Sequence, residues 1–105
     1  MTSPHRIELS GKIGLREAAG LAAALGDALD RHPAVTVVTG ALTEVDLSIL
    51  QLLVAARHSA ARAGKSLTLA GDPGEPMRDA LVRLGFLGPG GVARSPQEQF
   101  WVEAS

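Results

Sequence analysis

Three residues of the types used in catalysis lie close together in the middle of the chain: Asp46, Ser48 and His58. Asp46 stands between a β-branched run and a long apolar segment. An aspartate there is a natural helix N-cap, because its carboxylate accepts hydrogen bonds from the free amides of the first turn. A Ser–His–Asp triad fails on spacing, since Ser48 and His58 would lie about 15 Å apart along a helix. The residues therefore predict a capping or recognition site and no enzymatic activity.

Other hydroxyl groups near this junction are candidates for modification. Ser48 would lie in the first helical turn, where backbone amides can support a phosphate, and it is the candidate phosphoacceptor. Thr39 and Thr43, at the expected strand end and in the expected loop, are weaker candidates.

Histidines and glycines suggest no further chemistry. The three histidines are on different expected elements, which favours neither a metal site nor a catalytic base: His5, His32 and His58. The glycine-rich run at 88–91 matches no nucleotide-binding signature. The sequence therefore predicts no metal and no cofactor.

Composition narrows the class of protein. The chain has 105 residues, 46% of them hydrophobic, which suits one domain over 1–105 with an aliphatic core. A net charge of −1 and three aromatic residues give no reason to expect nucleic acid as a partner. No cysteine is present, so thiol chemistry is excluded. No apolar run is long enough to span a bilayer, and the first ten residues show no signal pattern; we expect a cytoplasmic protein without membrane insertion.

Strand and helix patterns alternate along the chain. Strands are expected at His5–Ser10, Ala34–Thr39 and Ser66–Ala70, and helices at about Leu15–Arg31, Leu47–Ala63, from Pro76 to Gly85, and after Ser95. Short connections between them predict an α/β layer sandwich, with a mixed sheet of about four strands and helices packed on it.

The helix after Asp46 has two apolar sides. A helical step of about 100° gathers one set on the expected core face: Ile49, Leu52, Leu53, Ala56, Ala60 and Ala63. A second stripe flanks Gln51 and His58 and consists of Leu47, Leu50, Val54 and Ala61. This stripe is either the margin of a wide buried face or an exposed patch for a protein partner.

The order of these motifs resembles a STAS domain, the family of anti-anti-sigma factors and of the cytoplasmic tails of sulfate transporters. The resemblance rests on the strand Val35–Thr39, the segment Thr43–Asp46, the helix start Leu47–Gln51, Gly64-Lys65 before a strand, and Leu84-Gly85-Phe86. It implies a non-enzymatic switch or adaptor that binds its partner at Thr43–Gln51.

One departure from the family pattern bears on regulation. Phosphorylated members carry Ser or Thr directly after the aspartate, whereas this chain has Leu47 there and Ser48 one place later. We expect any phosphorylation to fall on Ser48, and the partner surface to work without it. The expected partner-binding residues are Asp46, Leu47, Ser48, Leu50, Gln51, Val54 and His58.

The resemblance leaves the partner open. It could be an anti-sigma kinase, a chemotaxis-type histidine kinase or a response-regulator system. Two alternatives remain: an accessory subunit of a lipid-transport ABC complex, and a sensor binding a nucleotide or small ligand at the helix N-terminus. A homo-oligomer is also open.

Overall fold

The computed structural model describes residues 4–70 and 72–102 of the chain. Strands and helices alternate along most of it. The elements run in the order β1 (His5–Ile13), α1 (Leu15–Arg31), β2 (Ala34–Val45), α2 (Leu47–Arg62), β3 (Ser66–Leu69), α3 (Glu75–Arg83), the short 3-10 helix η1 (Pro89–Gly91) and α4 (Pro96–Val102).

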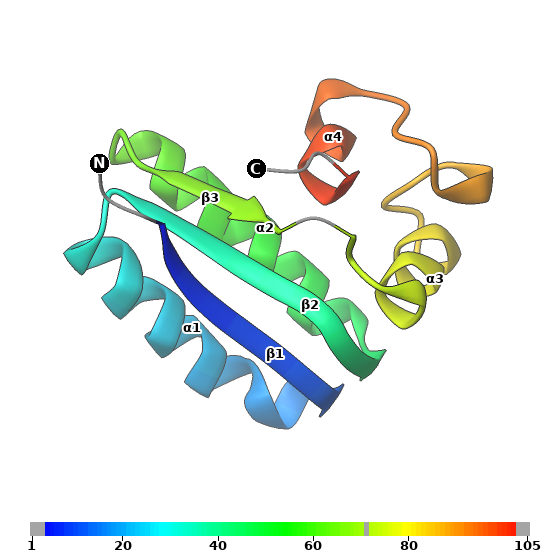
Figure 1. The fold of residues 1–105 in the computed structure, drawn as a ribbon, viewed down its shortest axis with the longest axis horizontal. Coiled ribbons are helices and arrows are strands. Elements are labelled where there is room, and N and C mark those ends of the chain that lie inside the picture. The colour runs from blue at the N-terminus through cyan, green and yellow to red at the C-terminus, as the bar shows by residue number, and fades with distance from the viewer. Residues whose placement is uncertain (1–3, 71, 103–105) are drawn as a thin grey trace.

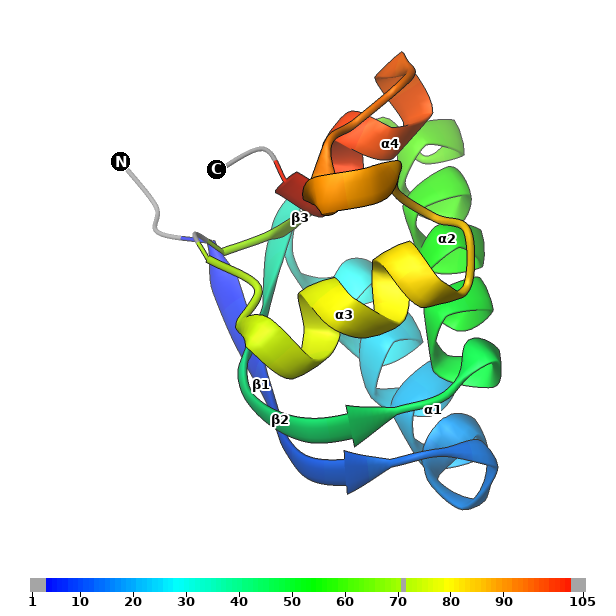
Figure 2. The same cartoon turned by 90° about the vertical axis from the view of Figure 1, so that its right-hand side faces the viewer.

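The three strands form one parallel sheet in the order β1-β2-β3. Helices α1 and α2 pack against each other on the same side of this sheet (Figure 1). Helix α3 lies at the end toward which β2 and β3 point, and α2 runs behind it in the turned view (Figure 2). The predicted α/β layer sandwich is confirmed. Its sheet, over the residues that the structure describes, has three parallel strands and not about four in a mixed arrangement.

Strands β1 and β2 are longer than the sequence pattern indicated. They stay paired as far as Ile13 and Val45, with register shifts between Glu8 and Ser10 and between Gly11 and Lys12. Gly11 adopts a φ of 70°, a conformation that glycine reaches without steric cost at such an irregularity. The expected loop before Asp46 is therefore mostly strand, because pairing with β1 satisfies its backbone groups.

The core is aliphatic, as the composition predicted. Alternate residues of β2 and β3 point into it, Val35 and Val37 from one strand and Leu67 and Leu69 from the other. Two of the helices supply much of the rest: Leu21, Leu25, Ala28 and Leu29 from α1, and Ile49, Leu50, Leu53 and Ala60 from α2.

The predicted core face of α2 is largely confirmed. Three of its six positions are buried: Ile49, Leu53 and Ala60. Leu52 and Ala56 are half-buried, and Ala63 is exposed. Ala63 is exposed because it is the C-cap of the helix.

The prediction was wrong for Leu50, which was placed on the partner surface and is 0% exposed. Arg57 lies two turns further along the same side of α2, and its guanidinium stacks on the Phe100 ring at 5.2 Å. The C-terminal segment thus packs on this side of the helix, along with the cluster of Phe86, Phe100 and Trp101. The second apolar stripe of α2 is partly core.

Helix α1 is closed at its far end by a residue from the α2–β3 connection. The ammonium Nζ of Lys65 donates a hydrogen bond to the backbone carbonyl of Leu29. A cation at the C-terminal end of a helix also interacts favourably with the helix dipole. The Gly64-Lys65 pair therefore links α1 to the start of β3.

Candidate functional site

Asp46 caps two helices at once. Its Oδ1 accepts hydrogen bonds from the Ser48 amide at 3.0 Å, from the Ile49 amide at 3.4 Å and from the Ser48 hydroxyl. Its Oδ2 accepts the amide of Leu15, the first residue of α1, at 3.0 Å. The N-termini of α1 and α2 therefore meet at one carboxylate. We call Gly14, Leu15, Asp46, Leu47 and Ser48 the Asp46 junction.

Gly14 allows this close approach. A Cβ atom at position 14 would lie 2.7 Å from Asp46 Oδ2, closer than real Cβ contacts. Its amide donates to Glu17 Oε2 at 2.8 Å, which is the half of a capping box that a residue without a side chain can form at the start of α1. The glycine is needed for space and not for conformation, since its φ of −144° is open to any residue.

The charge of Asp46 is held by these donors. Its pKa is lowered, chiefly by the hydrogen bond from the Ser48 hydroxyl and further by the amides of Ile49, Leu15 and Ser48. Amides at the start of α2 that could bind an external anion are thus already satisfied by a carboxylate of the chain. This arrangement disfavours the alternative of a nucleotide or small anion bound at the helix N-terminus.

Ser48 lies where a phosphate would meet opposition. A phosphoryl group on its oxygen would stand beside the Asp46 carboxylate and would remove the hydroxyl donor. Thr39, the weaker candidate, is buried, and its hydroxyl donates to the Pro73 carbonyl at 2.9 Å. Thr43 is an exposed residue of β2. Phosphorylation of Ser48 stays a prediction, and the geometry weighs against it.

The two helices that meet at Asp46 each begin with an exposed leucine. Leu47 is 43% exposed and Leu15 is 75% exposed, whereas the described chain has just one other exposed large apolar residue, Val92 at 61%. Both follow a cap residue directly, at the first positions of α2 and α1. Leu47 was named from the sequence as a partner-binding residue, but Leu15 was not, because no short-range sequence pattern connects position 15 with position 46.

The other predicted partner residues are distributed unevenly. Gln51 and His58 are exposed on α2, and Val54 is half-buried against the core. With Leu50 buried, the predicted strip is interrupted in its middle. The exposed apolar surface therefore centres on the junction and not along the length of α2.

A groove of about 260 Å³ opens beside the junction. Its walls come from the ends of β1 and β2, the start of α2 and the C-terminal end of α3. The lining residues are Lys12, Ile13, Gly14, Glu44, Val45, Asp46, Leu47, Arg83 and Leu84. We call it the junction groove.

Comparison with known proteins places this fold. A family model described as "Mlab, STAS domain" matches residues 2–88. The chain belongs to the STAS domain family. The resemblance drawn from the motifs is therefore confirmed. Comparison with curated proteins gives no match.

A solved structure supports the same fold for this STAS domain. It is a sulfate transporter family protein from Wolinella succinogenes, 21% identical in sequence, with a TM-score of 0.57. The match covers 91% of this chain and 80% of the other. At this level of identity the likeness concerns the fold alone.

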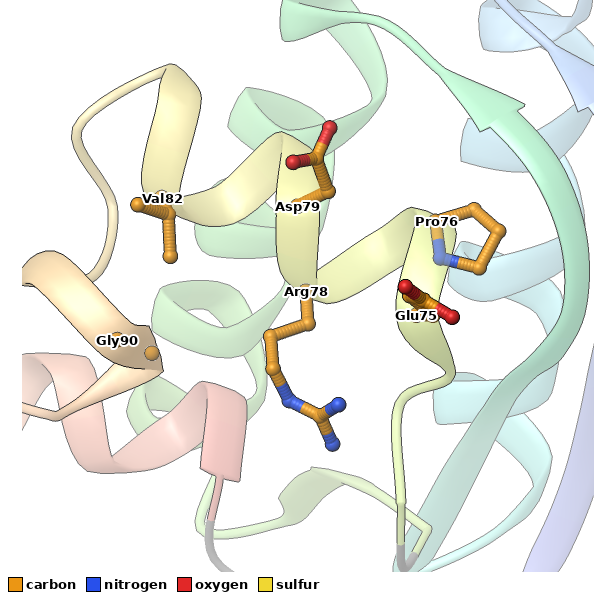
Figure 3. A pocket seen from close by; sticks show the side chains of 7 residues that line it. Glu75, Pro76, Arg78, Asp79, Val82 and Gly90 are labelled. Atoms are coloured by element: carbon orange, nitrogen blue, oxygen red, sulfur yellow. The ribbon is translucent and has the colours of Figure 1, made fainter.

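A larger cavity of the STAS domain lies elsewhere, between α3 and η1. It has a volume of about 670 Å³ and is lined by Glu75, Pro76, Arg78, Asp79, Val82, Gly90 and Gly91. Figure 3 shows the Arg78 guanidinium reaching away from Asp79. It pairs with Asp72 at 2.6 Å, and the pKa of Asp72 is lowered first by the Gly74 amide and then by this cation. Arg78, the cationic residue among those that line this α3–η1 cavity, therefore already has an anionic partner.

Two histidines that are distant in sequence come together. The rings of His5 and His32 stack with centroids 4.3 Å apart, while His58 lies on α2. Among residues 4–70 and 72–102, no group of three His, Asp or Glu side chains could hold a metal ion. In the same part of the chain, no helix is long and apolar enough to cross a membrane.

Proposed function

We propose that this STAS domain is a non-enzymatic adaptor that binds a protein partner through the Asp46 junction and the first turns of α2. The observation that carries the proposal is the pair of exposed leucines, Leu15 and Leu47, beside a carboxylate whose hydrogen bonds are already satisfied. An apolar centre with a polar rim is typical of protein interfaces. Exposed Gln51 and His58 contribute to that rim. We further propose a cytoplasmic location.

We infer that the adaptor works without a phosphorylation cycle. Leu47 replaces the hydroxyl residue that phosphorylated family members carry after the aspartate. The Ser48 hydroxyl donates to Asp46, so a phosphate there would remove this donor and place further negative charge beside the shared cap. A fixed apolar side chain at position 47 supports binding that is constant and set by the amount of partner.

The leading partner class is a bacterial signalling protein: an anti-sigma kinase, a histidine kinase assembly or a response-regulator system. A second candidate is an accessory role in a lipid-transport ABC complex, where a small STAS protein contacts the ATPase. Leu47 in place of a phosphoacceptor fits it equally, because such a subunit would need no kinase.

The test uses the full chain and the purified proteins encoded by neighbouring genes, either kinase and sigma-factor partners or permease and ATPase. Leu47→Asp should abolish binding in a calorimetric titration, because it places a charge at the centre of the apolar surface. Burial of a leucine on binding contributes roughly 1.5–3 kcal/mol before ordering costs.

A matched control is Val92→Asp, which changes an equally apolar residue in another part of the fold. It should leave binding unchanged. A thermal melt of each variant separates lost binding from lost folding. Unchanged binding by a folded Leu47→Asp variant would remove this surface from the mechanism.

A further inference from the structure

We propose that the junction groove receives an apolar side chain of the partner that is followed closely by a carboxylate, with Leu15 completing the contact surface. This inference rests on the proposed function, since it specifies the partner chemistry of the same surface. The occupant is a segment of another protein that carries an apolar residue next to Asp or Glu.

The size and lining of the groove set the apolar part of this occupant. A volume of about 260 Å³ suits one or two aliphatic side chains and is too small for a folded element. Its apolar wall comprises Ile13, Leu47 and Leu84, of which Leu47 is 43% exposed. A side chain entering beside Leu47 would cover apolar surface that solvent now touches.

The charges around the groove set the polar part. Lys12 and Glu44 pair with each other at 3.2 Å and cancel. Asp46 faces the N-termini of two helices, each equivalent to roughly half a positive charge, so its own charge is balanced. Arg83 is the remaining charge of the lining, and it is positive.

Arg83 is available to a partner. Its contact with Asp79 spans 3.8 Å between two well-exposed side chains on α3. Exposed pairs of this kind contribute little and are easily exchanged for a partner's carboxylate. An arginine at the rim of an apolar groove therefore favours an acidic group next to the apolar anchor.

Leu15 extends the same surface onto α1. Its backbone amide lies 3.0 Å from Asp46 Oδ2, and its side chain is 75% exposed. The shared cap holds the starts of α1 and α2 in fixed relation, so the backbone positions of the two exposed leucines, Leu15 and Leu47, are set before a partner binds. A preformed surface loses less entropy on binding.

The experiment selects peptides on the intact chain. Random 12-residue peptides displayed on phage are enriched on immobilised wild-type protein, and the strongest binder is synthesised and titrated by calorimetry. We expect selected sequences with an apolar residue followed within two positions by Asp or Glu. A selection that yields no such class overturns the proposal.

Variants then locate the bound peptide. Leu15→Ser and Arg83→Glu should each weaken its affinity by about tenfold or more. Val92→Ser and Arg62→Glu are matched controls, since both side chains are exposed and belong neither to the groove lining nor to the Asp46 junction. A peptide with Lys in place of its acidic residue should bind Arg83→Glu better than wild type.

The outcomes separate this inference from the proposed function. Peptide affinity that is unchanged in Leu15→Ser and Arg83→Glu, but lost in Leu47→Asp, overturns the acidic-partner assignment and leaves the adaptor surface standing. Affinity unchanged in all three removes both. Self-association of the chain that competes with the peptide would make the occupant a second copy and would also overturn the proposal.

Discussion

The Asp46 junction and the α3–η1 cavity differ in the groups that compensate their charged side chains. At the junction, one carboxylate accepts hydrogen bonds from backbone amides of two helices and from the Ser48 hydroxyl, and the first residues of these helices, Leu15 and Leu47, remain exposed. In the α3–η1 cavity, side chains satisfy each other, with Arg78 held by Asp72. The cationic side chain that lines the larger cavity is thus paired, whereas the lining of the junction groove includes an exposed leucine, Leu47.

This difference is the reason why we propose the partner surface at the smaller junction groove and not at the larger α3–η1 cavity. An exposed ion pair forms readily between flexible side chains and contributes little. The exposed leucines beside the double cap keep apolar surface in contact with water, which is unfavourable, and they bury little of it in the core. Their position is understandable if another molecule covers them, and this contrast can be tested at three levels of effect.

The largest effect should separate Leu50 from Leu47. Leu50→Ala removes a side chain that is 0% exposed and should cost about 2–5 kcal/mol of unfolding free energy. Leu47→Ala should change that free energy by about 0.5 kcal/mol or less, since this side chain is 43% exposed and the cap bonds are accepted by Asp46, not by Leu47. Urea unfolding followed by circular dichroism measures both. Similar losses for the two would mean that Leu47 belongs to the core and that the junction has no bare apolar surface.

A smaller effect should appear at Gly14. Its alanine variant pushes a methyl group against Asp46 Oδ2, so the double cap must open and the melting temperature should fall by several degrees. Gly26→Ala is the control, because its added Cβ meets nothing within 4 Å in the middle of α1. That change should stabilise by about 1 kcal/mol through helix propensity. A Gly14→Ala variant as stable as Gly26→Ala would show that the two helices are not joined at Asp46.

The smallest effect concerns acid. The pKa of Asp46 is lower in the fold than its ordinary value of 3.8, so its stabilisation is complete above that value and is lost as the pH falls through the folded pKa. Asp46→Asn should lower the stability at neutral pH and flatten its decline below about pH 4. Chemical denaturation at a series of pH values measures this.

Asp72→Asn provides the matched comparison for that measurement. The pKa of Asp72 is also lowered, so the sign of its pH dependence is the same, but its partners lie within six residues of it in the chain. We expect a weaker effect that shrinks further in high salt, because the pair with Arg78 is an exposed ion pair. An Asp72 effect equal to that of Asp46 would erase the contrast between the two regions.

Local signals in the sequence were enough for most helices. Asp46 as a cap, His32-Pro33 after α1 and Gly64 after α2 mark ends that the backbone itself dictates, and the structure places the ends there within a residue or two. The family resemblance followed from the order of such signals. Leu47 was named as a partner-binding residue, while the sequence left open whether its stripe was buried or exposed.

Features that depend on distant pairing were not predictable. Strand β2 continues beyond Thr39 to Val45 because β1 pairs with Ala41, Leu42, Glu44 and Val45, which no local propensity reveals. Leu50 is buried on a side of α2 that also packs against the C-terminal segment. That packing includes the contact of the Arg57 guanidinium with the Phe100 ring, 43 positions later in the chain. Leu15 joined the site through a hydrogen bond between residues 31 positions apart. A helix wheel contains none of these contacts.

The closure of α1 has a consequence for the order of folding. The first amide of α1 donates to Asp46, and the carbonyl of Leu29 in its last turn accepts from Lys65. Both of these partners are synthesised after the helix itself. A chain emerging from the ribosome would hold α1 with open ends until β2, α2 and the start of β3 had followed. The helix that comes first in the sequence would thus be secured late, and the partner surface would exist only once most of the domain had formed.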